Sequence, residues 1–471
     1  FILSGGVKYM KAATAFSRII QISMCLIVIA GLLACAPAPA PPVFKYESDA
    51  ALKQQLANVP AYPETSLIVI SDPHIFDSSL GTSGKAFEAY ILDDRKLVRE
   101  GPEILESAIA SINKLKDNIV LVPGDLTKDG EKSSHELAAG YLAQLKAAGK
   151  KIYVVPGNHD ILNGLSVKYV GDGTERVPNI TADQFSQIYA DYGYKDALQR
   201  DPNSLSYVAE PQPGLWLLAL DANLYKQNVE DKQSVTDGKF SPQTLAWIEN
   251  VLGQAAKENK AVIVMMHHGI MEHYAGQQKN YGEYIVDDYE AIAKMLANYN
   301  VRLVFTGHFH AQDITEKQYA DNGKYVFDVE TGSLVTYPCP IRVVDIGADQ
   351  NAKFTEDLVT AIKSHPTDFP AYAKQYLLDG FTVYIAKILQ GYKVGLPEAQ
   401  KIAKEIVVGY AAHLAGDEQL APGQTMVTET GLSPLAWAVV QYRKDMINGL
   451  WQDLPPPDNN VALNLKDGSW K

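Results

Sequence analysis

Short apolar runs alternate with amphipathic stretches from about residue 66 to residue 346. The runs are rich in Val, Ile and Leu and almost continuous, which is typical of strands buried on both faces of a sheet. Strands are predicted at 66–71, 118–123, 151–156, 214–220, 261–266 and 301–306, with weaker runs at 324–330 and 341–345. Helices are predicted near 102–116, 133–148, 242–258 and 287–299. This alternation predicts a layered α/β domain over residues 63–350.

The pattern changes after residue 350, where only helical periodicity is recognisable. Helices are predicted at 355–364, 369–391, 397–414 and 434–452, separated by Gly and Pro. The stretch from Pro455 onward is predicted to be a loose tail. We therefore expect residues 351–471 to form an all-α appendage, and the pattern does not indicate what it does.

The first 62 residues have the pattern of a targeting segment followed by a spacer. A basic segment begins at Met10, and the apolar stretch 19–33 that follows is shorter than the roughly 20 residues of a spanning helix. Its ending, Leu32-Leu33-Ala34-Cys35, resembles the lipobox of bacterial lipoproteins. We expect a signal peptide over residues 1–34, of which 1–9 can be upstream sequence, and a Pro/Ala-rich tether over 35–62. Lipidated Cys35 would then anchor the chain to the membrane, outside the cytoplasm in the bacterial cell envelope. An ordinary cleaved signal or an uncleaved anchor is the alternative.

Composition narrows the possible partners and metal ligands. The chain carries 42 Lys and Arg against 55 Asp and Glu, a net charge of −13. A groove for a nucleic-acid polymer needs clustered Lys and Arg, so this charge argues against one. Three cysteines, Cys25, Cys35 and Cys339, cannot build a disulfide framework or a thiolate zinc site. Any metal must therefore be held by His, Asp and Asn.

Metal-binding residue types gather at the points where five predicted strands end. The five segments are Asp72-Pro73-His74, Gly124-Asp125, Gly157-Asn158-His159-Asp160, His267-His268 and Gly307-His308-Phe309-His310. Each segment alone is weak evidence for a metal site, because a histidine or aspartate at a strand end usually has a structural role. In open α/β sheets the ligand crevice lies beyond the carboxyl ends of the strands, so five such ends can converge on one site.

The residue types in these segments suit a pair of metal ions. A carboxylate has two oxygens and can bridge two cations, whereas imidazole and the Asn carbonyl are neutral ligands that leave the cations electrophilic. Two cations about 3.5–4 Å apart can hold the attacking and leaving oxygens of a phosphoryl group and make hydroxide available near neutral pH. The segments therefore predict metal-assisted phosphoryl chemistry.

The order of the five segments is similar to that of the calcineurin-like metallophosphoesterase family, over residues 66–345. The resemblance implies a four-layer αββα sandwich with a binuclear site for two divalent ions, Mn, Fe, Zn or Co. By this resemblance one metal is held by Asp72, His74 and His310, the other by Asn158, His267 and His308, and Asp125 bridges them. His159 would stabilise transition-state charge or protonate the leaving oxygen, and Asp160 would orient its neighbours. His267 is preferred to His268 because it closes the strand.

The resemblance predicts hydrolysis of a phosphodiester or phosphomonoester by attack of a metal-bridging hydroxide. Gly124-Asp125-Leu126-Thr127 is similar to the Gly-Asp-Leu-Thr of cyclic-nucleotide and glycerophosphodiester phosphodiesterases, which slightly favours a diester. Lys128 stands where purple acid phosphatases carry Tyr, which argues against a tyrosinate–iron site. The alternative function is a metal-containing surface lipoprotein that binds a phosphorylated ligand or an envelope partner without turnover.

Loops, rather than the metal ligands, are expected to select the small phosphoester substrate. Candidates for the mouth of the site are Lys85, Arg95, Lys96, Arg99, the segment 161–204, His273 and Tyr274. For each of them, the alternative is a solvated surface position without a binding role.

Overall fold

The computed structural model describes residues 40–92, 94–116, 118–416, 418–420, 423 and 425–471. The predicted signal peptide and Cys35 lie outside the described residues. Within the part of the chain that is described, no helix is both long and apolar enough to cross a membrane.

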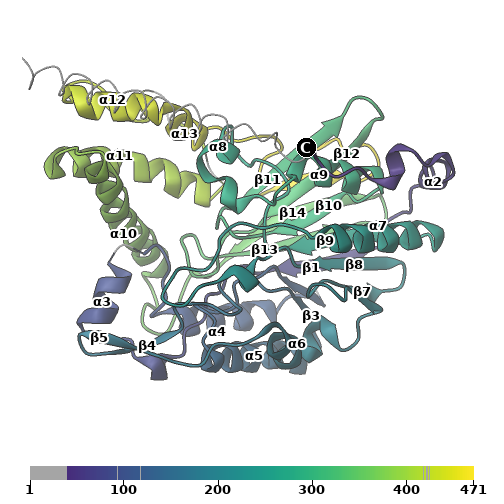
Figure 1. Cartoon of the computed structure of the whole chain (residues 1–471), viewed down its shortest axis with the longest axis horizontal. Helices are drawn as coiled ribbons and strands as arrows, with labels where there is room; N and C mark the ends of the chain where they lie inside the picture. The colour runs from purple at the N-terminus through teal and green to yellow at the C-terminus, as the bar shows by residue number, and fades with distance from the viewer. Residues whose placement is uncertain (1–39, 93, 117, 417, 421–422, 424) are drawn as a thin grey trace, which may run out of the picture. The chain divides into compact units, whose positions relative to one another are not determined.

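Two mixed β-sheets contain the predicted strands (Figure 1). The first sheet consists of β1 (Thr65–Val69), β2 (Ile119–Val122), β3 (Lys151–Val154), β13 (Pro340–Ile346), β14 (Asn351–Leu358) and β15 (Val461–Asn464). The second consists of β6 (Gln199–Arg200), β7 (Tyr207–Gln212), β8 (Leu215–Leu220), β9 (Ala261–Met266), β10 (Leu303–Thr306), β11 (Asp313–Tyr319) and β12 (Lys324–Glu330). Their orders are β15-β14-β13-β1-β2-β3 and β11-β12-β10-β9-β8-β7-β6. A separate hairpin pairs β4 (Val167–Val170) with β5 (Gly173–Arg176).

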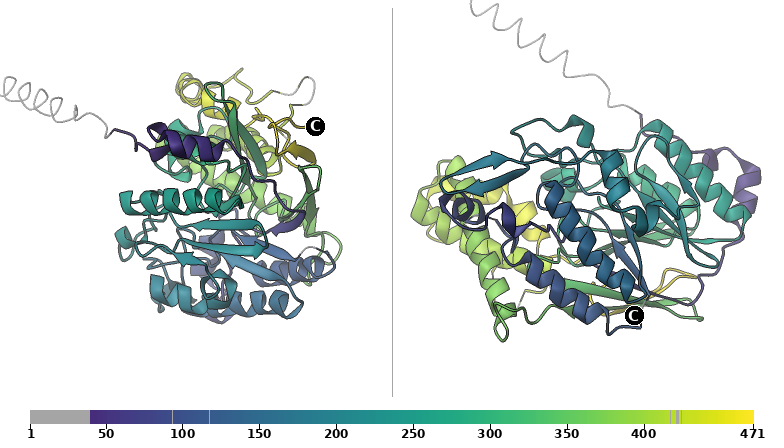
Figure 2. Two further views of the ribbon diagram at one scale, coloured as in Figure 1. Left: turned by 90° about the vertical axis from the view of Figure 1, so that its right-hand side faces the viewer. Right: turned by 90° about the horizontal axis from the view of Figure 1, so that it is seen from below.

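Helices connect and cover these strands. They are α2 (Ala50–Leu56), α3 (Lys85–Ile91), α4 (Gly101–Ile112), α5 (Lys132–Ala147), α6 (Ala182–Ile188), α7 (Pro242–Lys257), α8 (Gln277–Tyr281) and α9 (Tyr289–Asn298). Shorter helical turns are η1 (Lys45–Glu47), η2 (Ser78–Leu80), η3 (Ala190–Tyr194), η4 (Tyr225–Gln227) and η5 (Gly282–Tyr284). The view from below in Figure 2 shows α4 and α5 lying across one face of the sheets.

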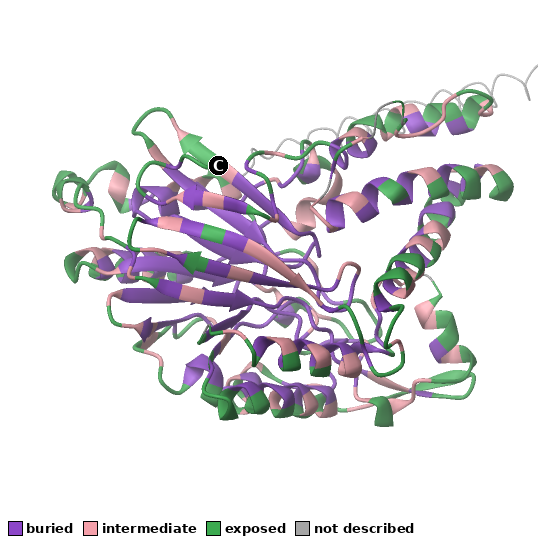
Figure 3. Ribbon diagram, turned by 180° about the vertical axis from the view of Figure 1, so that it is seen from behind, coloured by how far each residue is buried: buried purple, intermediate pink, exposed green. Residues whose placement is uncertain are grey.

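The alternation of side chains along the apolar strands builds a layered core, because successive residues of a strand point to opposite faces. On β8, Leu217 packs in a cluster shared with β1, β2, α4 and α5. Its neighbours Trp216 and Leu218 pack in a second cluster, shared with α7 and α9. The layers are therefore α4 and α5, the first sheet, the second sheet, and α7 with α9. This confirms the predicted four-layer αββα sandwich, whose strands are largely buried (Figure 3).

The parallel strands of both sheets carry the predicted site segments at their carboxyl ends. β1, β2 and β3 are parallel in the first sheet, and β8, β9 and β10 are parallel in the second. Each segment that follows β1, β2, β3, β9 or β10 consequently leaves its sheet at the carboxyl edge, where such sheets bind ligands.

Residues 351–471 are not purely helical, which corrects the expectation of an all-α appendage. β14 occupies part of the predicted helix 355–364 and pairs antiparallel with β13, and β15 lies in the predicted loose tail and pairs with β14. Phe354 and Leu463 are fully buried. The helix prediction is wrong for residues 355–358, because they continue the strand that Ala352 and Phe354 begin and pair with β13 up to Leu358.

The remainder of this region is mainly helical, although the single helix predicted at 434–452 is divided into two. Its helices are α10 (Phe369–Gly391), α11 (Leu396–Leu414), α12 (Pro434–Tyr442) and α13 (Lys444–Gly449), on the left in Figure 1. Their apolar faces pack on one another and on Tyr274 and Phe309 of the sandwich. Because Phe309 lies between two predicted metal ligands, these helices pack directly against a segment of the site.

The tether predicted over 35–62 extends too far into the folded part of the chain. α2 packs against α7, and Phe44, Leu56 and Tyr62 are buried in the two core clusters. From Val43 onward the chain therefore belongs to the same compact unit as the sandwich.

Candidate metal centre

The five strand ends bring the seven predicted ligand residues together at a cleft of about 460 Å³. His74, Asp125, Asn158, His308 and His310 line the cleft, whereas Asp72 and His267 are buried behind them. One group contains Asp72, His74, Asp125 and His310, and a second contains Asp125, His267 and His308. Asn158 joins the second group, because its Oδ1 lies 3.2 Å from His267 Nε2. These groups divide the residues in the same way as the family resemblance implies.

Asp125 lies between the two groups. Its Oδ2 is 3.5 Å from His74 Nε2 and 3.5 Å from His267 Nε2. Burial raises the pKa of the Asp125 carboxyl to about 6, since no charge in the protein fully replaces its lost hydration. A carboxylate in this position can contribute to two cation sites at once.

The first group has the spacing of ligands around one cation. His74 Nε2 and His310 Nε2 are 3.2 Å apart, and Asp72 Oδ1 is 3.4 Å from His310 Nε2. Ligand atoms about 2.1 Å from a tetrahedral cation are separated by about 3.4 Å. Asp72 Oδ1 is buried and has no hydrogen-bond partner. An oxygen in that state needs a positive partner, so the residues fit a divalent cation.

The imidazoles of the second group are oriented by main-chain carbonyls. His267 Nδ1 donates to the carbonyl of Pro123 (2.9 Å), which leaves its Nε2 facing Asn158. His308 Nε2 donates to the carbonyl of Thr236 (3.1 Å), which leaves its Nδ1 as the ligand atom. Such a bond from the other ring nitrogen is typical of histidines that bind metals.

His268 is placed differently from its neighbour. Its Nε2 lies 2.9 Å from the carbonyl of Thr236, and it belongs to neither donor group. Burial and the adjacent His267 lower its pKa to about 3. The geometry thus favours His267 as the ligand of this pair.

The backbone at the site is held in uncommon conformations. Asp72, His74, Asp125, His308 and His310 all have positive φ, between 39° and 76°. Such angles are rare outside glycine and asparagine and concentrate at functional sites. Gly124 also has positive φ (103°), and a Cβ on Gly157 would overlap the Asp125 carboxylate. The sharp turns let each side chain point back across the sheet edge.

His159 stands beside the two groups without joining either. Its Nδ1 lies 2.7 Å from the carbonyl of Lys128 and 3.0 Å from Asp129 Oδ1, while its Nε2 is 4.0 Å from Asp125 Oδ2. Burial lowers the pKa of His159, but the charges of Asp125 and Asp129 outweigh it and leave the pKa raised. An imidazole oriented in this way can deliver a proton from Nε2.

Asp160 orients the turn around Asp125. It accepts hydrogen bonds from the main-chain N–H groups of Gly157 (2.8 Å), Leu126 (3.2 Å) and Thr127 (3.0 Å). Leu126 and Thr127 are themselves buried and line no part of the cleft. The Leu126 and Thr127 backbone of the Asp-Leu-Thr sequence therefore helps to fix this turn through Asp160.

Only some of the residues expected at the mouth of the site line the cleft. Arg95 and Lys96 line the cleft, and Arg95 Nε is 3.3 Å from His310 Nδ1. Lys85 and Arg99 instead form surface ion pairs with Asp172 and Glu88. Within the described part of 161–204 only Leu165 lines the cleft, whereas His273 and Tyr274 are buried outside it.

Sequence reasoning missed several residues of the cleft. Asp129 lies 3.0 Å from His159 and forms an ion pair with buried Lys128. The Tyr284 ring packs on that of His308, with ring centroids 4.5 Å apart. Phe381 and Tyr384 of α10 also line the cleft. Asp129 could have been found by its position four residues after Asp125. The aromatic residues follow no strand end, so no local pattern marked them.

Comparisons with known proteins give a family and several similar solved structures. A family model described as calcineurin-like phosphoesterase matches residues 65–312, whereas no curated protein matches the chain. Similar solved structures include a dimetal phosphatase from Danio rerio, with 15% identity over 63% of this chain and 97% of that chain, and a TM-score of 0.45. A purple acid phosphatase from yellow lupin (Lupinus luteus) seeds has 13% identity over 64% of this chain and 53% of that one, with a TM-score of 0.39. Haemophilus influenzae NAD nucleotidase has 15% identity over 62% and 49%, with a TM-score of 0.32.

Proposed function

Because the chain belongs to the calcineurin-like phosphoesterase family, we propose that it is a hydrolase that cleaves a phosphodiester or phosphomonoester. The observation that carries the proposal is the position of Asp125, whose Oδ2 is 3.5 Å from a histidine of each donor group. Asp72, His74 and His310 would hold one divalent cation, and Asn158, His267 and His308 the other. When bound, such a pair neutralises phosphoryl oxygens and lowers the pKa of water toward neutrality.

The protein's own residues supply binding and proton transfer. Arg95 and Lys96, which line the cleft beside His74 and His310, would bind non-bridging phosphoryl oxygens, because guanidinium and ammonium groups recognise phosphate. His159 would donate its Nε2 proton to the leaving oxygen, since its Nδ1 is engaged by the Lys128 carbonyl and Asp129. Asp129 would hold that imidazole in orientation and support its cationic form.

The proposal is tested with the full chain and a matched pair of synthetic substrates. Hydrolysis of bis(p-nitrophenyl) phosphate and p-nitrophenyl phosphate is measured with Mn, Fe, Zn or Co. His267→Gln should reduce kcat by about 10³-fold, because loss of a cation removes several kcal/mol of transition-state stabilisation. His268→Gln, the adjacent histidine outside both donor groups, is the control and should keep activity within about tenfold of wild type.

The same assay separates hydrolysis from the alternative of a phosphate-binding protein. Metal-dependent turnover that His267→Gln removes supports a hydrolase. Saturable binding of inorganic phosphate with no product release on any ester would contradict it. Equal turnover in both histidine variants would contradict the assignment of His267.

We also propose that the chain is anchored outside the cytoplasm through Cys35, on the strength of the lipobox-like Leu32-Leu33-Ala34-Cys35. In a bacterial host, the full chain should incorporate labelled palmitate, and Cys35→Ser should not. Labelling of both proteins, or of neither, would contradict lipidation at Cys35.

A further inference from the structure

A second group of metal-binding residues lies outside the cleft. Asp313 at the start of β11, His413 near the end of α11 and Glu418 just beyond it are all buried. One ligand atom of each lies within 4.8 Å of the others. His413 Nδ1 is 2.6 Å from Glu418 Oε1 and 3.9 Å from Asp313 Oδ2. The three come from distant parts of the chain and meet where α11 joins the sandwich.

A third carboxylate, that of Asp458, adjoins the group. Buried Asp458 accepts a hydrogen bond from the main-chain N–H of Ile314 (2.8 Å) through Oδ1, but its Oδ2 has no hydrogen-bond partner, nor has Asp313 Oδ2. Burial raises the pKa of Asp458, and the neighbouring Asp313 and Glu418 raise it further. An anion buried in this way is costly unless a cation faces it.

The neighbouring basic side chains bond to atoms other than Asp313 Oδ2 and Asp458 Oδ2. His273 Nδ1 lies 2.7 Å from Asp313 Oδ1, and its other nitrogen lies 3.2 Å from Asp328. Arg342 donates to the main-chain carbonyl of Asp458 (2.7 Å) and not to its carboxylate. Asp313 Oδ2 and Asp458 Oδ2 therefore remain buried near the His413 imidazole without a hydrogen-bond partner.

We propose that Asp313, His413, Glu418 and Asp458 bind a further divalent cation that has a structural role. A single imidazole nitrogen among carboxylate oxygens suits Mn²⁺ or Zn²⁺. The cation fastens the end of α11 to β11. It also supports the cleft from behind, because the His413 ring packs on Phe309, between His308 and His310, with centroids 5.6 Å apart.

The test uses the full chain with ligands removed from both cleft groups, so that it does not depend on the phosphoesterase proposal. In an Asp72→Ala/Asp125→Ala/His267→Ala/His308→Ala background, the metal content after dialysis against Zn²⁺ or Mn²⁺ should be one equivalent per chain. Adding Glu418→Gln should reduce it to none. Adding Glu249→Gln, a buried glutamate on α7 outside every donor group, should leave it at one.

Thermal unfolding provides a second measurement on the same background. Zn²⁺ or Mn²⁺ should raise Tm, because a ligand that binds only the folded state stabilises it, and Glu418→Gln should remove the shift. A metal content near zero without any Tm shift would overturn the proposal. So would one equivalent that persists in Glu418→Gln.

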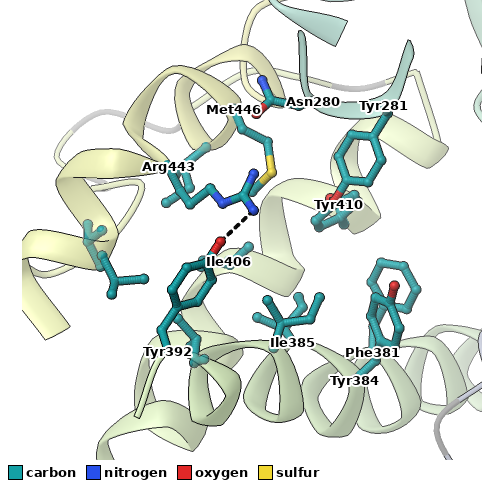
Figure 4. A pocket seen from close by; sticks show the side chains of 15 residues that line it. Asn280, Tyr281, Phe381, Tyr384, Ile385, Tyr392, Ile406, Tyr410, Arg443 and Met446 are labelled. Carbon is teal, nitrogen blue, oxygen red and sulfur yellow. Dashed lines mark hydrogen bonds between the residues drawn. The ribbon is translucent and has the colours of Figure 1, made fainter. Parts of the chain in front are cut away.

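A different observation concerns the C-terminal helices, which enclose an apolar cavity of about 160 Å³ (Figure 4). Ile385 of α10 and Ile406 of α11 lie on one side, and Met446 of α13 lies opposite them. The guanidinium at its edge, that of Arg443, donates to the Tyr392 hydroxyl (2.7 Å). Cavities of about 150 Å³ lined by such side chains bind benzene.

The cavity adjoins the cleft. Phe381 and Tyr384 of α10 line both spaces. Arg95 lies over the Phe381 ring, 5.5 Å from its centroid, and reaches His310 on its other side. These two aromatic residues therefore border both the proposed phosphate site and the apolar cavity.

We infer that the substrate is an amphiphilic phosphoester, an inference that rests on the proposed hydrolase function. Its phosphoryl group lies in the cleft, and an alkyl or aryl group of about six carbons passes Phe381 and fills the cavity. The size follows from the cavity volume, because benzene has six carbons and fits a space of about 150 Å³.

A homologous series of p-nitrophenyl alkyl phosphodiesters, from methyl to octyl, tests this inference. Wild-type kcat/KM should rise by about fourfold per methylene, the factor that corresponds to about 0.8 kcal/mol for each buried CH₂, and level off near hexyl. Val440→Phe, which fills the cavity, should flatten the rise. Val383→Phe, on α10 but outside the cavity lining, should keep it.

The outcomes of the series are distinguishable. Turnover of the methyl ester with no dependence on chain length would overturn the amphiphilic substrate and leave the hydrolase intact. A rise that persists in Val440→Phe would place the alkyl group elsewhere and also overturn it. Absence of turnover at every length would contradict the hydrolase function, and the inference with it.

Discussion

Two donor clusters of similar composition occupy different environments. The cleft cluster (Asp72, His74, Asp125, Asn158, His267, His308 and His310) opens into a cleft beside His159, whose side chain is 26% exposed. The buried cluster (Asp313, His413, Glu418 and Asp458) lines no such cleft among the described residues. Catalytic metal sites keep an open position for water or substrate, whereas structural sites are closed. The surroundings of each cluster, rather than its donor types, therefore indicate a catalytic role for the cleft cluster and a structural role for the buried cluster.

The largest expected effect comes from removing the region that contributes most of the buried cluster. Deleting residues 353–471 removes most of β14 and all of β15, so that β13 loses its outer neighbours and buried Phe354 and Leu463 are lost. The truncated chain should fail to accumulate as soluble protein. Measurement of soluble yield and circular dichroism checks this, and a soluble fragment with wild-type Tm would show that the C-terminal region is separable.

A paired substitution tests the division of roles between the clusters. Asp125→Ala should reduce kcat by about 10³-fold or more, with Tm little changed. Asp313→Ala should destabilise the fold by about 3–5 kcal/mol, because it leaves buried His273 without its 2.7 Å partner. Kinetics and denaturant unfolding on both variants give the comparison. A mainly catalytic effect of Asp313→Ala, or a mainly destabilising effect of Asp125→Ala, would reverse the assignment.

A smaller effect is expected from the proton donor of the cleft. His159→Gln should lower kcat by about 10²-fold, the usual contribution of general acid catalysis. The loss should be greater for an alkyl ester than for a p-nitrophenyl ester, because a poor leaving group needs protonation more. Equal losses on both esters would show that His159 acts on the phosphoryl oxygens instead.

The smallest effect concerns a group outside both clusters, which provides a baseline for stability against pH. Burial, with a contribution from Arg302, lowers the pKa of Lys324 to about 8 from its usual value near 10.5. Between these values the unfolded chain binds more protons than the folded chain, so this group makes stability rise with pH across that window. Lys324→Met should flatten that rise in urea unfolding from pH 7 to pH 11. An unchanged slope would show that Lys324 does not titrate there.

The sequence allowed the cleft cluster to be predicted because its geometry is local. Each donor directly follows a buried strand, and parallel strands place their carboxyl ends at one edge of the sheet. The position of a segment such as Gly307-His308-Phe309-His310 therefore follows from the strand that precedes it. The strand β9 and the helix α10 were likewise predicted with the bounds that the structure has. Continuous apolar runs and long amphipathic stretches are strong patterns.

The remainder could not be predicted because it depends on contacts between distant parts of the chain. The donors of the buried cluster come from β11, α11 and two loops, and none of them stands in a recognisable segment. The helix predicted at 355–364 begins inside β14, where residues 355–358 show no alternation of buried and exposed positions. The approach of Phe381 to the cleft follows from the packing of α10 on the sandwich, which no local pattern specifies.

The most direct test of the central claim, that strand ends gather donors around a pair of cations, is anomalous scattering from crystals of the full chain grown with Mn²⁺. The claim predicts two peaks in the cleft about 3.5–4 Å apart, with the Asp125 carboxylate between them and His74 and His267 on opposite sides. A single peak, or peaks that do not contact Asp125, would contradict it.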